Sequence, residues 1–188
     1  MGVHWRSDTP CIRLGMRHPW TRVSPERRSH LLFPLMGLCG LATVWMGWLG
    51  QPIDVGLPGS GILALEFCWW DHRCADLMAT WSHPSVALSG LYGDYLYMVV
   101  YAATLGLAVV QARPHLSARW ARLGEPLAWC VMLAAGLDAL ENLALIRLVG
   151  GAVGPEAAVA FVCASFKFAI LALGLGYAAA GALGFLSS

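Results

Sequence analysis

Four long apolar segments dominate this chain and restrict the folds that it can adopt. They cover about residues 31–49, 89–112, 126–149 and 157–183. At a rise of about 1.5 Å per residue, each segment is long enough as a helix to cross the roughly 30 Å of hydrocarbon in a bilayer. The sequence therefore predicts an all-α fold, a polytopic membrane four-helix bundle.

The composition also favours lipid as the solvent for much of the surface. Of the 188 residues, 58% are hydrophobic and 12% are charged, whereas soluble domains contain about 45–50% apolar and about 25% charged residues. A soluble chain of this size needs more charge to cover its surface. The formal net charge of +1 makes nucleic acid an unexpected partner.

The arginines predict how the chain is oriented in the membrane. Nine of the eleven form two blocks, Arg6, Arg13, Arg17, Arg22, Arg27 and Arg28 before the first segment, and Arg113, Arg119 and Arg122 between the second and third. Basic flanks are typical of the cytoplasmic side. We expect a multi-pass protein of a bacterial inner membrane with both termini cytoplasmic. An export signal would also begin with arginines, but no small-x-small cleavage site follows the first segment.

The remaining sequence divides into a tail and one membrane domain. Residues 1–23 are expected to form a loosely ordered, basic cytoplasmic tail, and residues 24–188 a single transmembrane domain that begins with Pro25 at the first helical position. Residues 61–81 have apolar positions at helical spacing, including Phe67 and Trp70, but too many charges for a span. We expect an amphipathic helix in the outer interface, on which Glu66 would be solvated.

The six cysteines form no CxxC pair, and three lie inside predicted spans, so we predict no disulfide framework. Cys68 and His72 are one helical turn apart and, with Cys74, could contact a metal. A closed metal site needs further ligands that the sequence does not supply nearby. We therefore expect no metal and no cofactor.

A cluster of polar residues lies within the third and fourth apolar segments. Asp138, Glu141 and Asn142 are spaced i, i+3 and i+4, which places them on one helix face. Lys167 lies in an apolar run near the middle of the next helix. A short turn over residues 150–155 makes the two helices an antiparallel hairpin, so we expect an ion pair between Asp138 and Lys167 near the bilayer midplane.

The second apolar segment carries a polar stripe of its own. Asp94, Tyr97, Tyr101 and Thr104 recur at helical spacing and should line the same interior. Asp94 lies at a depth similar to that of Glu141, and two such carboxyls would tend to share a proton. The predicted ligand-binding or proton-relay site is therefore Asp94, Tyr97, Tyr101, Asp138, Glu141, Asn142 and Lys167. The alternative is that these residues only fix how the helices pack.

At these positions the chain resembles an uncharacterised family of small bacterial four-helix membrane proteins with an intramembrane Asp-x-x-Glu-Asn element. The resemblance runs from about Leu63 to Gly176. It is carried by Leu-Glu-Phe at 65–67, Asp-Tyr-Leu-Tyr at 94–97, Asp-Ala-Leu-Glu-Asn at 138–142 and Ser-Phe-Lys at 165–167. It implies the bundle and its polar core but no activity.

Three functions remain compatible with the sequence. The first is binding, or proton-linked transport, of a small or lipidic ligand. The second is an enzyme that acts on a lipid or isoprenoid by acid/base chemistry, for which no catalytic residue is assigned. The third is an accessory subunit of a membrane complex. We expect membrane lipid around the chain, with a homo-oligomer or a membrane-complex partner in the first and third cases. The sequence contains no Ser-His-Asp arrangement, HExxH motif or phosphate loop that would indicate a hydrolase or kinase.

Overall fold

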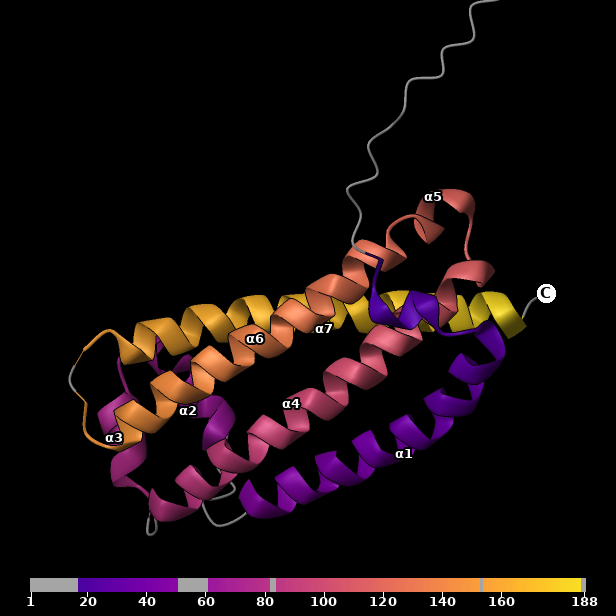
Figure 1. Cartoon of the computed structure of the whole chain (residues 1–188). Helices are drawn as coiled ribbons and strands as arrows, with labels where there is room; N and C mark the ends of the chain where they lie inside the picture. Colours follow the sequence, from indigo (N-terminus) through magenta and orange to yellow (C-terminus); the bar gives the residue numbers. More distant parts are fainter. Residues whose placement is uncertain (1–16, 51–60, 82–83, 153, 187–188) are drawn as a thin grey trace, which may run out of the picture.

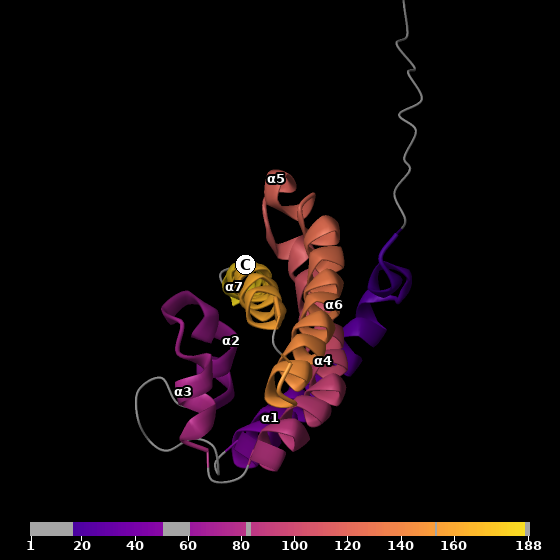
Figure 2. The ribbon, with the colours of Figure 1, turned by 90° about the vertical axis from the view of Figure 1, so that its left-hand side faces the viewer.

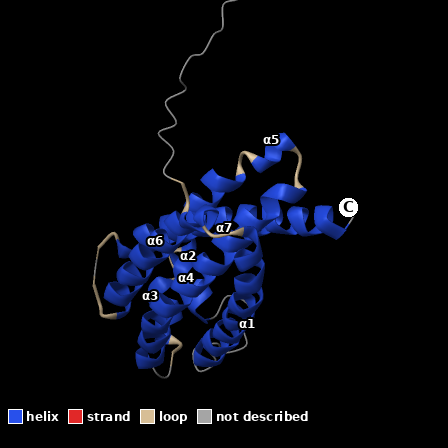
Figure 3. Ribbon diagram, turned by 45° about the vertical axis from the view of Figure 1, so that its right-hand side comes forward, coloured by secondary structure: helices blue, strands red, loops and turns tan. Residues whose placement is uncertain are grey.

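The computed structural model describes residues 17–50, 61–81, 84–152 and 154–186. All regular structure among these residues is helical, which confirms the predicted fold class (Figure 3). The four long helices are α1 (Pro25–Gly50), α4 (Pro84–Ala112), α6 (Gly124–Val149) and α7 (Glu156–Leu186). The short elements are η1 (Pro19–Arg22), α2 (Gly61–Asp71), α3 (Cys74–Ala79), η3 (Arg113–His115) and α5 (Ala118–Ala121).

The four long helices are each long and apolar enough to cross a membrane, as the sequence predicts. Their outer faces carry large exposed apolar side chains, among them Phe33 (75% exposed) and Val44 (72%) on α1 and Leu173 (66%) on α7. Surfaces of this kind are unfavourable in water and match the hydrocarbon of a bilayer. The chain therefore has the form of a multi-pass membrane protein.

The long helices lie side by side, with α6 and α7 joined by a short turn as an antiparallel hairpin (Figure 1). Helix α4 packs on both, and the core between them includes Val109, Val110 and Val131. Gly174 lets α7 approach closely, because a Cβ there would lie 3.1 Å from Leu105 and 3.2 Å from Val131. In contrast, α1 packs mainly along α4 and has no buried residue.

Residues 61–81 do not form the single helix that we expected. The chain turns at His72, whose φ of 59° is left-handed, and this turn ends α2 before α3 begins. Helix α2 packs against α7, and Figure 2 shows α2 and α3 beside that helix. Leu65 and Glu66 are buried there, whereas Trp70, expected on the apolar face of an interfacial helix, is 74% exposed. The contact with α7 therefore determines which face of α2 is buried.

A disulfide joins Cys68 to Cys74, so the prediction of no disulfide was wrong for this pair. The turn at His72 separates the two helices and brings the two Cα atoms to 4.9 Å, within the usual range for a disulfide. A continuous helix would not have placed the thiols together. The bond also uses both cysteines that the metal hypothesis required.

The end of the expected tail is ordered, so the prediction of a loose segment up to residue 23 was wrong for residues 17–23. Residues 1–16 lie outside the described part. His18 is 1% exposed, donates its backbone N–H to Glu125 Oε1 at 2.9 Å, and lies edge-on to Trp129. Burial lowers the pKa of His18, and the nearby Glu125 carboxylate partly opposes that effect. These contacts hold the start of α1 against α6.

Candidate functional site

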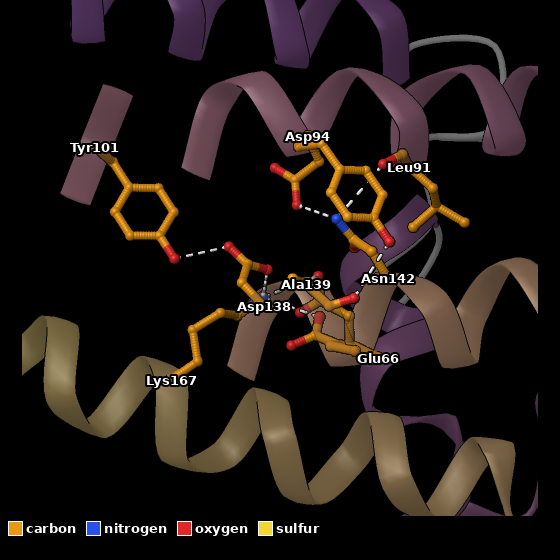
Figure 4. A network of polar contacts seen from close by, with 10 residues as sticks. Glu66, Leu91, Asp94, Tyr101, Asp138, Ala139, Asn142 and Lys167 are labelled. Atoms are coloured by element: carbon orange, nitrogen blue, oxygen red, sulfur yellow. Dashed lines mark hydrogen bonds and ion pairs between the residues drawn. The ribbon is translucent and has the colours of Figure 1, made fainter. Parts of the chain in front are cut away.

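Lys167, the only lysine in the chain, lies at the centre of a buried acidic cluster. Its Nζ donates hydrogen bonds of 2.9 Å to Asp138 Oδ1 and to Glu141 Oε1, and it lies 3.7 Å from Glu66 Oε1 (Figure 4). All four residues are at most 6% exposed. The predicted ion pair between Asp138 and Lys167 is confirmed, and two further carboxyls share the same ammonium.

Helix geometry explains how Asp138 and Lys167 meet. Each lies eleven residues from the turn end of its own helix, which is about 17 Å at the rise of an α-helix. In an antiparallel hairpin, two residues at equal distances from the turn lie at the same height. Glu141, one turn away on α6, faces the same partner.

A second polar layer connects α4 to α6. Asn142 Nδ2 donates to Asp94 Oδ2 at 2.7 Å, and the Tyr101 hydroxyl donates to Asp138 Oδ2 at 2.8 Å. The layer that the sequence predicts between these helices is therefore present. Within this layer Asp94 is paired with Asn142 and Glu141 with Lys167, and no hydrogen bond between Asp94 and Glu141 is present among the described residues.

Two residues of the predicted stripe bond to α1 instead of the cluster. The Tyr97 hydroxyl lies 3.1 Å from Thr43 Oγ1, and since Thr43 donates to the Cys39 carbonyl at 2.8 Å, Tyr97 is the donor. The Thr104 hydroxyl lies 3.2 Å from the Leu35 carbonyl, besides its bond within α4. Tyr97 thus has no hydrogen bond to the described carboxyls of the cluster, and the stripe divides between two partners.

The cluster contains more acid than base. Glu66, Asp94, Asp138 and Glu141 supply four carboxyls, and Lys167 is the one cationic side chain that forms an ion pair with any of them among the described residues. Uncompensated charge in a low-dielectric interior is very unfavourable. The folded cluster therefore needs protons, or a cation, in addition to Lys167.

Two carboxylate oxygens in the cluster have no hydrogen-bond donor. Oε2 of Glu66 and Oε2 of Glu141 are buried, and neither accepts a hydrogen bond from the part of the chain that the structure describes. Buried acceptors in folded proteins are nearly always bonded. The Glu66 and Glu141 carboxyls are within hydrogen-bonding reach of each other, so a proton shared between them would stabilise this part of the cluster.

A cavity of about 1210 Å³ adjoins the cluster. Its polar wall consists of Glu66, Asp94, Tyr97, Tyr101, Thr104, Asp138, Asn142 and Lys167, while Glu141 lies behind this wall. The rest of the lining is mostly apolar and comes largely from α1, α4 and α7, with residues such as Phe33, Met36 and Leu175. An apolar space with a few convergent polar groups is typical of a ligand site.

Sequence reasoning missed Glu66 as a member of the site. It is the single acid in the apolar run from Ile62 to Phe67, which is the same kind of signal that identified Asp138 and Lys167. Because residues 61–81 carry several other charges, we expected this acid to be solvated. The wall formed by α1 had no sequence signal, since its cavity-lining residues are mostly ordinary apolar side chains and include no charged one.

The chain matches no protein-family model, no curated protein and no solved structure.

Proposed function

We propose that this membrane protein binds a small or lipidic amphipathic ligand inside the bilayer, and that binding is linked to proton uptake or release. The main support is that three carboxyls surround the only lysine, with Asp94 as a fourth in the same polar cluster, at the side of a large apolar cavity. The polar end of a ligand would contact the cluster and its apolar part would fill the cavity.

The position of α1 supports entry of the ligand from the lipid. Helix α1 packs mainly on α4, and its cavity-lining residues Phe33 and Met36 are 75% and 54% exposed. On the opposite wall, Leu175 of α7 lines the cavity and is 61% exposed. The space between α1 and α7 is thus continuous with the lipid-facing surface, which suits a ligand that is dissolved in the membrane.

The charge imbalance supports the link to protons. The number of protons on the four carboxyls depends on what other positive charge is present. A bound ligand that supplies charge or hydrogen-bond donors would change that number, and by linkage the proton concentration would change the affinity for the ligand. Coupling of this kind is what proton-linked transport requires.

The two ends of the bundle support the proposed orientation, with both termini in the cytoplasm of a bacterial cell. The Cys68–Cys74 disulfide is at the α2–α3 end, and the arginine-bearing α5 segment is at the other (Figure 1). Disulfides persist in oxidising compartments, and basic loops are retained in the cytoplasm. Both features favour an α2–α3 end outside the inner membrane.

A substitution that narrows the cavity tests ligand binding. Leu175→Trp would place a bulkier side chain in the cavity lining, and Leu173→Trp is the matched control, because Leu173 is on the same helix and 66% exposed but does not line the cavity. Native mass spectrometry of protein from gently solubilised membranes should detect less retained amphiphile with Leu175→Trp than with wild type or Leu173→Trp. Equal retention by both variants would contradict the proposal.

Acid/base catalysis is a second candidate, favoured by the contrast between two carboxyls of the cavity wall. Asp138 is held by an ammonium and a tyrosine hydroxyl, whereas Asp94 is held by the neutral amide of Asn142. Two carboxyls in different environments can serve as acid and base for one substrate. Incubation of purified protein with membrane lipid extract separates the two candidates, because only an enzyme would produce a new lipid that disappears with Asp94→Asn.

A further inference from the structure

We infer that the ligand is a lipophilic cation, an organic ammonium with one elongated apolar chain. This inference rests on the proposed function and adds the chemical class of the ligand. It follows from the two cavity-lining carboxyls, Glu66 and Asp94, that receive no hydrogen bond from Lys167, and from the extent of the apolar wall beyond them.

Glu66 is the first of these two carboxyls. It is 6% exposed and lines the cavity, and its Oε2 accepts no hydrogen bond from a described residue. Its other oxygen is 3.7 Å from Lys167 Nζ, whereas Asp138 and Glu141 are both at 2.9 Å from that nitrogen. Lys167 therefore stabilises Glu66 least, and a cation in the cavity would add positive charge beside this carboxyl.

Asp94 is the second of the two cavity-lining carboxyls. It lines the same cavity, and its side-chain hydrogen bond comes from the neutral amide of Asn142. No cationic side chain among the described residues forms an ion pair with it. An ammonium near Asp94 and Glu66 would give each carboxyl a charged partner and would replace protons as the balance for the acidic cluster.

The sign of the charge discriminates between ligand classes. A carboxylate or phosphate would add negative charge to a cluster that already has four acids for one lysine, and like charges in a low dielectric repel strongly. A neutral alcohol could donate a hydrogen bond but would leave the charge uncompensated. Glu66 and Asp94 therefore favour an ammonium over both an anion and a neutral alcohol.

The apolar wall defines the rest of the ligand. On α7 it continues from Lys167 through Leu171, Leu175 and Ala178 to Phe185, a distance of about 27 Å along the helix. Helix α1 faces it from Gly50 to Ser29. A long, mostly apolar wall that begins at the carboxyls fits a chain attached to one cationic end.

Binding to the protein in zwitterionic lipid nanodiscs tests the inference with three radiolabelled probes of equal chain length: dodecylammonium, dodecanol and dodecanoate. At pH 7 we expect saturable binding of dodecylammonium, at least about tenfold tighter than that of dodecanol, and weaker binding still of dodecanoate. Glu66→Gln and Asp94→Asn should each weaken dodecylammonium about tenfold and leave dodecanol within about twofold. Glu156→Gln, which neutralises a buried acid outside the cavity wall, should change neither.

Each other outcome has a defined meaning. If dodecanol binds saturably and as tightly as dodecylammonium, the inference of a cationic ligand is rejected and the proposed function stands. If no probe binds saturably, both are rejected. If dodecanoate binds best, or if Glu156→Gln weakens dodecylammonium as much as Glu66→Gln does, the inference is overturned. Asp94→Asn decides the matter if Glu66→Gln does not fold, as judged by circular dichroism.

Discussion

Lys167 Nζ lies 3.7 Å from Glu66 Oε1, which connects the middle of α7 to the short helix α2. This contact makes α2 part of the interior of the bundle and adds a third carboxyl to the two that α6 presents to Lys167. The chain's only lysine is thereby enclosed by acids from two different elements. Substitutions of Lys167 and of its neighbours should therefore lower the free energy of unfolding by different amounts, in an order that follows from their contacts.

Lys167→Met should be the most destabilising of these changes. It removes the single cation from a buried group of carboxyls, and breaking a buried ion pair from one side costs about 3–5 kcal/mol. Arg147→Met is the comparison, because the arginine of its ion pair with the buried Glu156 is 64% exposed. Water can replace part of this exposed cation, so the loss should be smaller than for Lys167→Met. Denaturant titration in mild detergent measures both, and equal losses would contradict the central role of Lys167.

Tyr101→Phe should destabilise the chain more than Tyr97→Phe. Tyr101 donates to the Asp138 carboxylate, and a hydrogen bond to a charged group contributes about 1.5–3 kcal/mol. Tyr97 donates to the Thr43 hydroxyl, a neutral bond worth about 0.5–1.5 kcal/mol. The free energies of unfolding of the two variants, measured under the same conditions, should differ in that order. The reverse order would show that Asp138 does not depend on Tyr101.

The Cys68–Cys74 disulfide predicts which of the described thiols react. Cys68 and Cys74 should be protected in denatured, unreduced protein and should react with a polyethylene-glycol maleimide only after reduction, whereas Cys39, Cys130 and Cys163 should react without it. The short loop that the bond closes should contribute about 2 kcal/mol to the free energy of unfolding in the loop-entropy model. Cys68→Ser should therefore lower stability and abolish the reduction-dependent shift, whereas Cys163→Ser should retain that shift.

His18 should make stability depend on pH. Its pKa in the folded protein is below the usual 6.5 because the ring is buried. Well above pH 6.5 the ring is neutral in both the folded and the unfolded chain, so the stability that its burial provides is fully present. As the pH falls through 6.5, the unfolded chain binds the proton first, and stability decreases until the pH reaches the lower pKa of the folded protein.

Thermal unfolding of wild type and His18→Gln between pH 8 and pH 5 measures this contribution. The wild type should lose stability on acidification by more than His18→Gln does. His30→Gln is the control, since His30 is exposed on α1 and its replacement should keep the wild-type pH dependence. Identical pH profiles for wild type and His18→Gln would exclude the role of the buried ring.

The sequence was sufficient for features that depend on one helix or on one hairpin. The four long helices follow from apolar length alone, which is a local property. The shared face of Asp138, Glu141 and Asn142 follows from the helical period, and the ion pair with Lys167 follows because a short turn sets both residues at the same height.

Other features depend on contacts between elements that are distant in the chain. Only the packing of α2 on α7 distinguishes Glu66 from a solvated acid, and only the turn at His72 brings Cys68 to Cys74. The rotation of α4 sends the Tyr101 hydroxyl to α6 and that of Tyr97 to α1.

Hydrophobicity and helical spacing thus determined which segments enter the membrane and which faces carry polar groups, because both are set by neighbouring residues along the chain. The tertiary structure decided how each helix is rotated, which carboxyls surround Lys167 and where the cavity opens. Those outcomes follow from the packing of side chains on several helices at once. Each buried charge must be paired with groups from neighbouring helices, and these groups depend on how all the helices pack together.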